Sequence, residues 1–414
     1  MKSSEQTRNG IGGIDLWMTL AAVAIATLLI VLATQAQAQT FTVLHNFTDG
    51  ADGSGPFGGV ALDRAGNLYG TTTAGGNGDG GTVYKLSHIG SGWTLNTLYG
   101  FNHPNDPILV MSGVVFGPDG TLYGTGNEGG ANRDGAVFNL RPPATVCGSV
   151  SCPWTLTLVH SFSGSDGSNP DYGDLIFDSA GNVYGTTYAG GAYGYGTVFE
   201  LTRSGSGWTE TVLYSFTGGD DGSYPENGVA FDSAGNLYGT ATYGGTRGAG
   251  TVYELSPSGS GWSETTLYSF TGGNDGENPI ASVAVDSRGN LYGTTNAGGS
   301  GGDGTAWVLS PSGGNWTLTV VQSFSNGYEG PFATPTLDAA GNVYGTSSFS
   351  GEGDGLAFKL TPSGDGWSYT DYDFNGNNGS ILVGGVTIDA SGSLYGTAAA
   401  GGTHNQGVVW EITP

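Results

Sequence analysis

Positive charge is scarce in this 414-residue chain, which has 10 lysine and arginine residues against 35 aspartate and glutamate residues. The formal net charge is −25 at pH 7. Because so few cations are available to replace the counterions of a polyanion, the composition argues against binding to nucleic acid or to an anionic lipid surface. Cations, saccharides without strong negative charge and other proteins remain as partners.

Long hydrophobic runs are also absent, with one exception near the N-terminus. Residues 16–33 are almost continuously apolar and precede an A-x-A-like cleavage site at residues 36–38. This pattern predicts a signal peptide over residues 1–38 and a single mature domain over residues 39–414. An uncleaved membrane anchor is the alternative, since the run is long for a signal peptide. Both interpretations predict an exported protein that is secreted, periplasmic or held at the cell surface.

Glycine is abundant, with 80 residues, and it recurs at fixed offsets from aromatic and β-branched residues. The segment GNLYGTT at residues 66–72 is the first of seven similar copies. Their tyrosines are Tyr69, Tyr123, Tyr184, Tyr238, Tyr292, Tyr344 and Tyr395. Successive tyrosines are 54, 61, 54, 54, 52 and 51 residues apart, which is the period of a propeller blade.

Each repeat contains four strand-like runs separated by turn residues. The fourth repeat shows them most clearly, at residues 228–232, 236–241, 250–255 and 262–270. The mature sequence begins with residues 41–47, which match the fourth run, and ends with a third run. The sequence therefore predicts an all-β, seven-bladed propeller with four antiparallel strands per blade. One N-terminal strand (about 41–47) closes the ring by joining three C-terminal strands (about 385–412).

The glycine of the repeated segment lies inside a predicted strand, where glycine is normally unfavourable. Its recurrence predicts the close approach of a bulky side chain, for which the aromatic residues of the third strands are the candidates. These are Tyr84, Phe138, Phe199, Tyr253, Trp307, Phe358 and Trp410. Because the middle strands of a blade are covered on both faces, the segment is interpreted as blade packing with its tyrosines in the core.

The repeat unit at residues 228–270, GVAFDSAGNLYGTA through WSETTLYSF, closely resembles the GloVer tandem repeat. This repeat occurs in exported bacterial proteins called choice-of-anchor tandem repeat GloVer-containing proteins. The similarity covers essentially all of residues 41–414, and the first two strands of each unit are also similar to NHL-type propeller repeats. The resemblance implies a propeller fold and export, and it brings no catalytic residues.

One acidic position recurs in the loops that join the fourth strand of one repeat to the first strand of the next. It is occupied by Asp52, Asp106, Asp166, Asp221, Asp275 and Glu329, with Asn378 in the seventh copy. We call these six carboxylates the acidic ring. Either they make local hydrogen bonds that shape each turn, or they form an oxygen-rich site for sugar hydroxyls or Ca²⁺. No loop has the ligand density of a dedicated calcium motif, and the sequence predicts no other cofactor or metal site.

Loop aromatic residues on the same face have two explanations. They either stack on sugar rings or cover loop glycines. They are Tyr188, Tyr193, Tyr195, Tyr224 and Tyr243.

Cysteine is limited to Cys147 and Cys152, in an insertion that accounts for the 61-residue spacing. Their separation and the predicted export favour a structural disulfide at the base of a hairpin. His45 and His160 occupy positions held by tyrosine in other repeats, and they are interpreted as tyrosine substitutes.

No catalytic residue is predicted, because the sequence has no G-x-S-x-G, H-E-x-x-H or phosphate-binding loop. The leading hypothesis is a non-enzymatic binding or scaffolding propeller that recognises a polysaccharide or a protein at or outside the cell envelope. A polysaccharide hydrolase or lyase that uses mouth carboxylates, and a structural surface or matrix component, are the alternatives.

Overall fold

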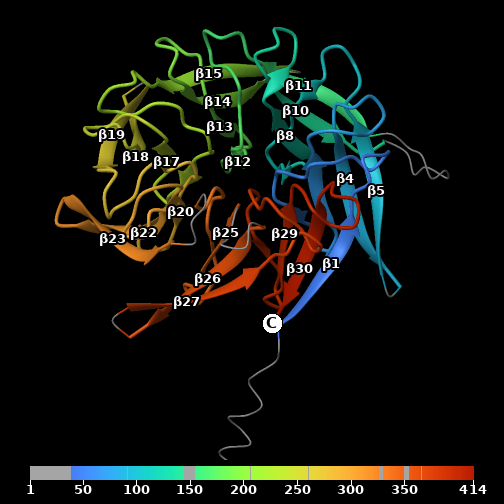
Figure 1. Ribbon diagram of the computed structural model, residues 1–414. Helices are drawn as coiled ribbons and strands as arrows, with labels where there is room; N and C mark the ends of the chain where they lie inside the picture. Colours follow the sequence, from blue (N-terminus) through green and yellow to red (C-terminus); the bar gives the residue numbers. More distant parts are fainter. Residues whose placement is uncertain are drawn as a thin grey trace, which may run out of the picture.

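The computed structural model describes residues 39–90, 92–143, 154–205, 207–259, 261–325, 330–348, 354–364 and 366–414. Within these residues every regular element is a β-strand, and seven four-stranded antiparallel sheets form a ring of blades (Figure 1). The predicted seven-bladed propeller is confirmed. Among the described residues, no helix has the length and apolar character needed to cross a membrane.

The strands fall into four types, which succeed one another from the centre of the ring to its rim. The innermost strands are β2 (Ala61–Leu62), β7 (Val115–Phe116), β12 (Ile176–Phe177), β16 (Ala230–Phe231), β20 (Ala284–Val285), β24 (Thr336–Leu337) and β28 (Thr387–Ile388). The second strands are β3 (Leu68–Thr72), β8 (Leu122–Gly126), β13 (Val183–Thr187), β17 (Leu237–Ala241), β21 (Leu291–Thr295), β25 (Val343–Ser347) and β29 (Leu394–Ala398).

The third strands are β4 (Thr82–Ile89), β10 (Ala136–Arg141), β14 (Thr197–Ser204), β18 (Thr251–Ser258), β22 (Thr305–Ser312), β26 (Leu356–Ser363) and β30 (Val408–Thr413). The outer strands are β5 (Gly92–Gly100), β11 (Thr155–Ser161), β15 (Gly207–Ser215), β19 (Gly261–Ser269), β23 (Asn315–Ser323), β27 (Gly366–Asp373) and β1 (Thr40–Asn46). Blades 1 to 7 follow this order, and a small extra sheet pairs β6 (Pro107–Ile108) with β9 (Glu128–Gly129).

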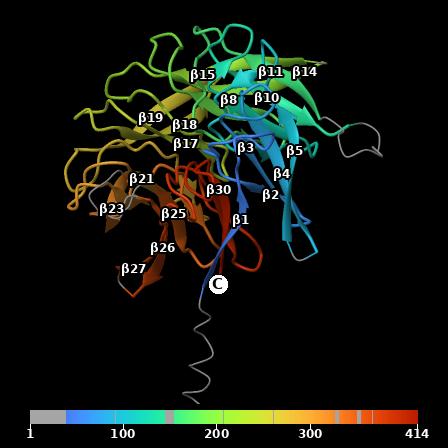
Figure 2. The ribbon, with the colours of Figure 1, turned by 45° about the vertical axis from the view of Figure 1, so that its right-hand side comes forward.

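Blade 7 closes the ring with strands from both ends of the domain. Its strand order is β1-β30-β29-β28, and Phe41 of β1 is paired with Ile412 of β30. The blue β1 runs beside the red β30 in Figure 1, and the turned view places blade 1 next to them (Figure 2). Leu44 and Phe47 are buried, so the N-terminal strand supplies core side chains as well as a covered sheet edge.

The glycine of each repeated segment faces the aromatic residue predicted for it. In blade 1, Gly70 pairs with Tyr84, and a Cβ at Gly70 would lie 2.3 Å from the tyrosine oxygen. The same pairing holds in the other six blades, at Gly124–Phe138, Gly185–Phe199, Gly239–Tyr253, Gly293–Trp307, Gly345–Phe358 and Gly396–Trp410. The glycine is required because any side chain at this position would overlap the neighbouring ring.

The tyrosine and threonine of the segment connect neighbouring blades. The Tyr69 ring contacts Phe116 of blade 2 with a centroid separation of 5.1 Å, and its hydroxyl donates to Asp63 at 3.1 Å. The Thr71 hydroxyl donates to the carbonyl of Ser112 at 2.7 Å, also in the next blade. The motif tyrosines are 1 to 7% exposed, which confirms that they belong to the core.

Candidate functional site

The described members of the acidic ring hydrogen-bond within their own loops. The Asp221 carboxylate accepts from the Tyr214 hydroxyl at 2.9 Å and from the backbone N–H of Thr217 at 2.7 Å. Asp52, Asp106, Asp166 and Asp275 make the equivalent contacts to their outer strand and loop. Each carboxylate therefore shapes the loop that carries it, and Glu329 lies outside the described residues.

The two outer-strand histidines occupy the place of a tyrosine hydroxyl. His45 Nε2 lies 3.0 Å from Asp52 Oδ2, and His160 Nε2 lies 3.0 Å from Asp166 Oδ2. The interpretation of these histidines as tyrosine substitutes agrees with this geometry. Cys147 and Cys152 lie outside the described residues, and their predicted disulfide stays a prediction.

The sevenfold regularity breaks at one position near the entrance to the innermost strands. The residue there is Phe57, Met111, Asp171, Glu226, Ile280, Phe332 or Val383 in blades 1 to 7. Five blades thus place an apolar side chain at this position, whereas blades 3 and 4 place carboxylates. Blade 3 also has one more residue than blade 4 between this position and the innermost strand. Asp174 lies there, two residues before β12.

Asp171 and Glu226 are mostly buried and influence each other. Burial raises the pKa of Asp171 to about 7, although the neighbouring Asn127 side chain opposes the rise. Burial also raises the pKa of Glu226 to about 7, and the nearby Asp171 charge adds to the effect. Asp171 Oδ1 is buried and has no hydrogen-bond partner among the described residues. Such perturbed and poorly satisfied carboxylates are typical of functional sites.

Four loop tyrosines gather beside these carboxylates, and we call Tyr188, Tyr195, Tyr224 and Tyr243 the tyrosine cluster. Tyr188 and Tyr224 are stacked with centroids 4.7 Å apart. Tyr195 and Tyr243 contact Tyr224 edge-on, at 5.8 and 6.1 Å. Burial raises the pKa values of Tyr188 and Tyr243, and in both cases the Glu226 charge contributes next. Tyr188 and Tyr243 therefore lie close enough to Glu226 for its charge to affect them.

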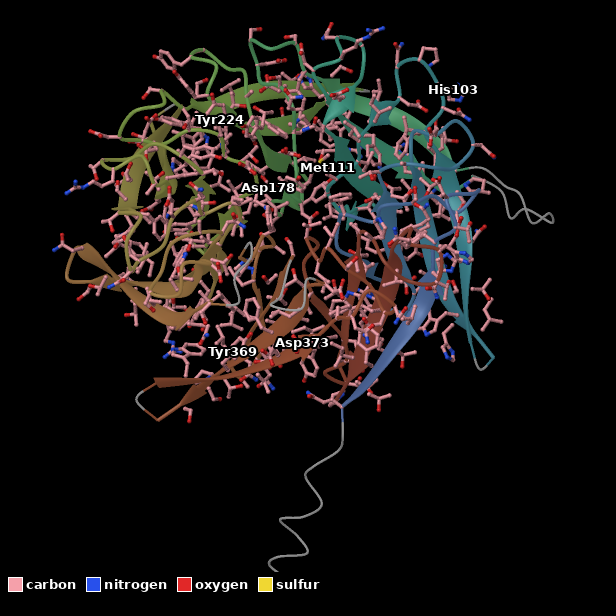
Figure 3. The ribbon with its side chains drawn as sticks, in the orientation of Figure 1. His103, Met111, Asp178, Tyr224, Tyr369 and Asp373 are labelled. Carbon is pink, nitrogen blue, oxygen red and sulfur yellow. The ribbon has the colours of Figure 1, made fainter. Side chains whose placement is uncertain are left out.

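The tyrosine cluster is partly open to solvent. Tyr195 and Tyr243 are 38% and 42% exposed, and Tyr193 on the same loop as Tyr195 is 62% exposed. Tyr224 takes a left-handed φ of 57°, which is uncommon for a bulky residue. Figure 3 labels Tyr224 among the loops of blades 3 and 4.

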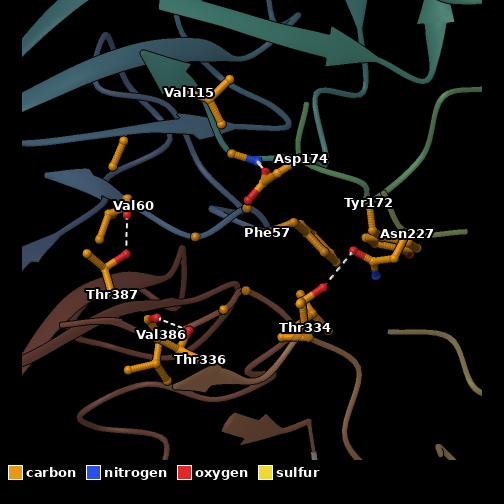
Figure 4. Close-up of a pocket in the computed structure, with 18 of the residues that line it drawn as sticks. Phe57, Val60, Val115, Tyr172, Asp174, Asn227, Thr334, Thr336, Val386 and Thr387 are labelled. Carbon is orange, nitrogen blue, oxygen red and sulfur yellow. Dashed lines mark hydrogen bonds between the residues drawn. The ribbon is translucent and has the colours of Figure 1, made fainter. Parts of the chain in front are cut away.

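A channel between innermost strands adjoins this site. The cavity has a volume of about 400 Å³ and is lined mainly by glycine and apolar residues. Asp174 is the only charged side chain among its described lining residues, and it accepts a hydrogen bond from the backbone N–H of Gly113 at 2.9 Å. The Asp174 carboxylate faces the channel, but protein atoms surround it. This loss of solvation raises its pKa to about 6. Figure 4 shows Asp174 and Tyr172 at this channel.

Tyr172 connects the channel to the carboxylate pair. It lines the channel, and burial raises its pKa to about 12, with Asp171 and Glu226 contributing through their charges. On the same side, Thr334 donates to Asn227 Oδ1 at 3.5 Å across the channel, as the dashed line in Figure 4 marks. The site thus extends from the exposed tyrosines to the channel wall.

The comparison with known proteins identifies a repeat family. The model of the Gloeobacter/Verrucomicrobia repeat matches residues 30–170, 145–336 and 260–414, which together span the described domain. The search among curated proteins found no match.

Solved structures with a similar fold have low sequence identity to this chain. One is described as an oxidoreductase (glucose dehydrogenase) from Thermus thermophilus, with 15% identity, a TM-score of 0.42, and coverage of 72% of this chain and 95% of that one. Polysaccharide lyase Uly1 has 12% identity, a TM-score of 0.48 and coverage of 92% and 94%. A protein of unknown function from Dyadobacter fermentans DSM 18053 has 13% identity, a TM-score of 0.43 and coverage of 91% and 99%. At these values the titles carry no argument about the activity of this chain.

Proposed function

The chain belongs to the Gloeobacter/Verrucomicrobia repeat family, and we propose that it is an exported, non-enzymatic propeller that binds a polysaccharide at or outside the cell envelope. We place the binding site at the tyrosine cluster and the carboxylates Asp171 and Glu226. The observation that carries the proposal is the break in symmetry: two adjacent blades replace an apolar position with acids and surround it with tyrosines.

The chemistry of the site suits a sugar. Tyrosine presents a rigid apolar face against which a pyranose ring can pack, and its hydroxyl remains available for hydrogen bonding. A carboxylate accepts hydrogen bonds from two sugar hydroxyls, and Asp171 Oδ1 lacks a partner among the described residues. Because the chain carries a net charge of −25, we expect neutral or amino-sugar polymers to bind better than polyuronates.

A retention assay on residues 39–414 tests the proposal directly. The purified domain is incubated with xylan, chitosan, insoluble cellulose or alginate, and the retained protein is measured. The variant Tyr195→Ala/Tyr243→Ala removes two exposed rings and should lower retention on the bound polymer by at least roughly tenfold. Ile89→Ala is the matched control, because Ile89 is also exposed, at 65%, but it is the last residue of β4 and lies outside the tyrosine cluster. Equal retention of the double variant and the wild type would contradict the proposed site.

The acidic ring gives a second arm of the same experiment. Asp275→Asn neutralises a ring member outside the tyrosine cluster, and Glu226→Gln neutralises the buried carboxylate. We expect only the second variant to lose binding. A loss with Asp275→Asn instead would assign the ligand to the acidic ring. Loss of wild-type retention in EDTA that CaCl₂ restores and ZnCl₂ does not would assign retention to Ca²⁺. A protein partner would follow from the absence of retention on every polymer.

A polysaccharide hydrolase or lyase is the second candidate, and the raised pKa values of Asp171 and Glu226 favour it. A carboxyl group whose pKa lies near neutrality can act as a general acid, and a second carboxylate beside it can act as base or nucleophile. The assay therefore also measures new reducing ends and the ultraviolet absorbance of unsaturated lyase products. Product that disappears in Glu226→Gln would replace the binding function with an enzymatic one.

A further inference from the structure

Three potential metal ligands lie close together at the rim between blades 2 and 3. None of them belongs to the tyrosine cluster. His160 belongs to outer strand β11, Asp166 to the following loop, and Glu210 to outer strand β15. One ligand atom from each lies within 4.8 Å of the others. The side chains of His160 and Asp166 are 20% and 21% exposed, so an ion can reach them from solvent.

The other blades supply internal controls, because the same three positions recur around the ring. Between blades 7 and 1 they hold His45, Asp52 and Leu95, so the glutamate is missing. Between blades 3 and 4 they hold Tyr214, Asp221 and Glu264, so the histidine is missing. The remaining described sets are Tyr99–Asp106–Leu156, Tyr268–Asp275–Leu318 and Tyr372–Asn378–Phe41. Among the described sets, imidazole and both carboxylates coincide only at His160, Asp166 and Glu210.

Glu264 of blade 4 occupies the position equivalent to Glu210, but the two carboxylates differ in their hydrogen bonds. Glu264 Oε1 accepts a hydrogen bond from Thr266 at 3.0 Å. The residue equivalent to Thr266 is Val212 in blade 3, and Glu210 Oε1 is buried with no hydrogen-bond partner among the described residues. A buried carboxylate oxygen without a partner is unfavourable unless a cation or proton satisfies it.

Asp166 is already held in place on its other side. Its Oδ1 accepts from the backbone N–H of Ser163 at 2.8 Å and from the Ser163 hydroxyl at 3.0 Å, while Oδ2 faces His160 Nε2 at 3.0 Å. Hydrogen bonds that orient a ligand from behind are usual at metal centres. An ion would replace the His160–Asp166 hydrogen bond and use the free oxygen of Glu210.

We propose that His160, Asp166 and Glu210 bind a divalent transition-metal ion of the Zn²⁺ class, with water completing the coordination. One imidazole nitrogen with two carboxylates suits Zn²⁺ better than Ca²⁺, which takes six to eight oxygen ligands. In tetrahedral Zn²⁺ geometry the ligand atoms lie about 3.4 Å apart, so modest side-chain movements would close the site. The ion would cross-link β11 of blade 2 to β15 of blade 3.

Calorimetric titration of the EDTA-treated domain, residues 39–414, with ZnCl₂, MnCl₂ or CaCl₂ tests this inference. We expect one Zn²⁺ per chain and a higher melting temperature in Zn²⁺ than in EDTA. His160→Tyr and Glu210→Leu introduce residues found in sibling blades, so both variants should fold. Loss of a group that only hydrogen-bonds to a metal ligand typically lowers metal affinity roughly 10- to 100-fold. Because each variant removes a ligand itself, we expect Zn²⁺ affinity to fall by at least this factor.

His45→Tyr is the matched control, since it alters the same hydrogen bond where no glutamate is present. It should leave the Zn²⁺ affinity and stoichiometry unchanged. The assignment is overturned if Zn²⁺ does not bind, if Ca²⁺ binds more tightly than Zn²⁺, or if Glu210→Leu retains wild-type affinity. A metal-dependent melting temperature that is lost in His45→Tyr but kept in His160→Tyr would move the site to the other histidine. Because saccharide retention is measured separately at the tyrosine cluster, failure of either proposal leaves the other standing.

Discussion

Gly396 of β29 is paired with Trp410 of β30, and a Cβ at Gly396 would lie 2.3 Å from the indole ring. Real Cβ atoms essentially never come within 3.0 Å of a neighbour, so this glycine is a packing requirement. The same relationship links a second-strand glycine to a third-strand aromatic residue in every blade. The repeated segment, of which GNLYGTT at residues 66–72 is the first copy, therefore serves the packing of the blades and is not evidence for a ligand.

Gly396→Ala should destabilise the domain by about 1–3 kcal/mol, because the added methyl group overpacks the core around Trp410. Gly92→Ala is a suitable control, since a Cβ at Gly92 would meet no atom within 4 Å. Urea denaturation followed by tryptophan fluorescence measures both variants. If Gly396→Ala were as stable as Gly92→Ala, the close approach between Gly396 and Trp410 would be wrong.

Deletion of β1 should open the ring. A chain that starts at Thr48 loses the pairing with β30 and the buried side chains of Leu44 and Phe47, and it exposes the edge of β30. We expect a lower melting temperature and self-association, seen by calorimetry and light scattering. Addition of a synthetic peptide with the sequence of residues 39–47 should restore the monomer. Unchanged stability after deletion would show that closure by β1 contributes little.

The sequence was sufficient for the blade architecture because packing between blades imposes the same residues seven times. The glycine–aromatic pairs and the assignment of residues 41–47 to blade 7 follow from that repetition. The threonine of the motif was not explained, because the partner of Thr71 is a carbonyl of the next blade, which the spacing does not reveal.

The candidate site was predicted only in part. The loop tyrosines were identified, but Asp171, Glu226 and Glu210 were not, although alignment of the repeats shows acids where most siblings have apolar residues. Burial and unsatisfied oxygens, which distinguish these carboxylates, depend on side-chain packing and cannot be read from spacing.

Asp275→Asn should destabilise the domain by about 1 kcal/mol at neutral pH through weakened loop hydrogen bonds. Although burial opposes it, hydrogen bonds from Thr271 and Tyr268 hold the pKa of Asp275 below its usual value. The Asp275 carboxyl group therefore binds its proton more tightly in the unfolded state than in the folded state. Its ionised form stabilises the fold above the unfolded pKa, and this stabilisation is lost as pH falls. Asn378 occupies the equivalent position in blade 7, and its side chain accepts a backbone hydrogen bond at 2.8 Å.

Calorimetry of Asp275→Asn and wild type at pH 3 and pH 7 checks this sign. The difference in melting temperature should be larger at pH 7. A larger difference at pH 3 would contradict the stabilising role of the ionised carboxylate.

Replacement of the buried carboxylates, in Asp171→Asn/Glu226→Gln, should have the opposite pH dependence. Their pKa values of about 7 lie above the unfolded values near 4, so the folded state binds more protons between these limits. Their contribution to the free energy of unfolding therefore falls as pH rises from about 4 to 7. The double variant should melt like the wild type at pH 4 and roughly 1–3 °C above it at pH 8.

The comparison with Asp275→Asn makes this a test of the local environment, since both variants remove negative charge from a strongly acidic chain. If the only effect were relief of charge repulsion, both variants would be more stable than wild type at pH 8. The local environments instead predict that Asp171→Asn/Glu226→Gln is more stable and Asp275→Asn is less stable. Glu226→Ile, which introduces the residue of blade 5, should also stabilise the domain while it removes saccharide binding. Higher stability together with lost binding would mean that the two carboxylates are kept for a ligand at a cost to the fold. A double variant less stable than wild type at pH 8 would instead make them part of the structural core.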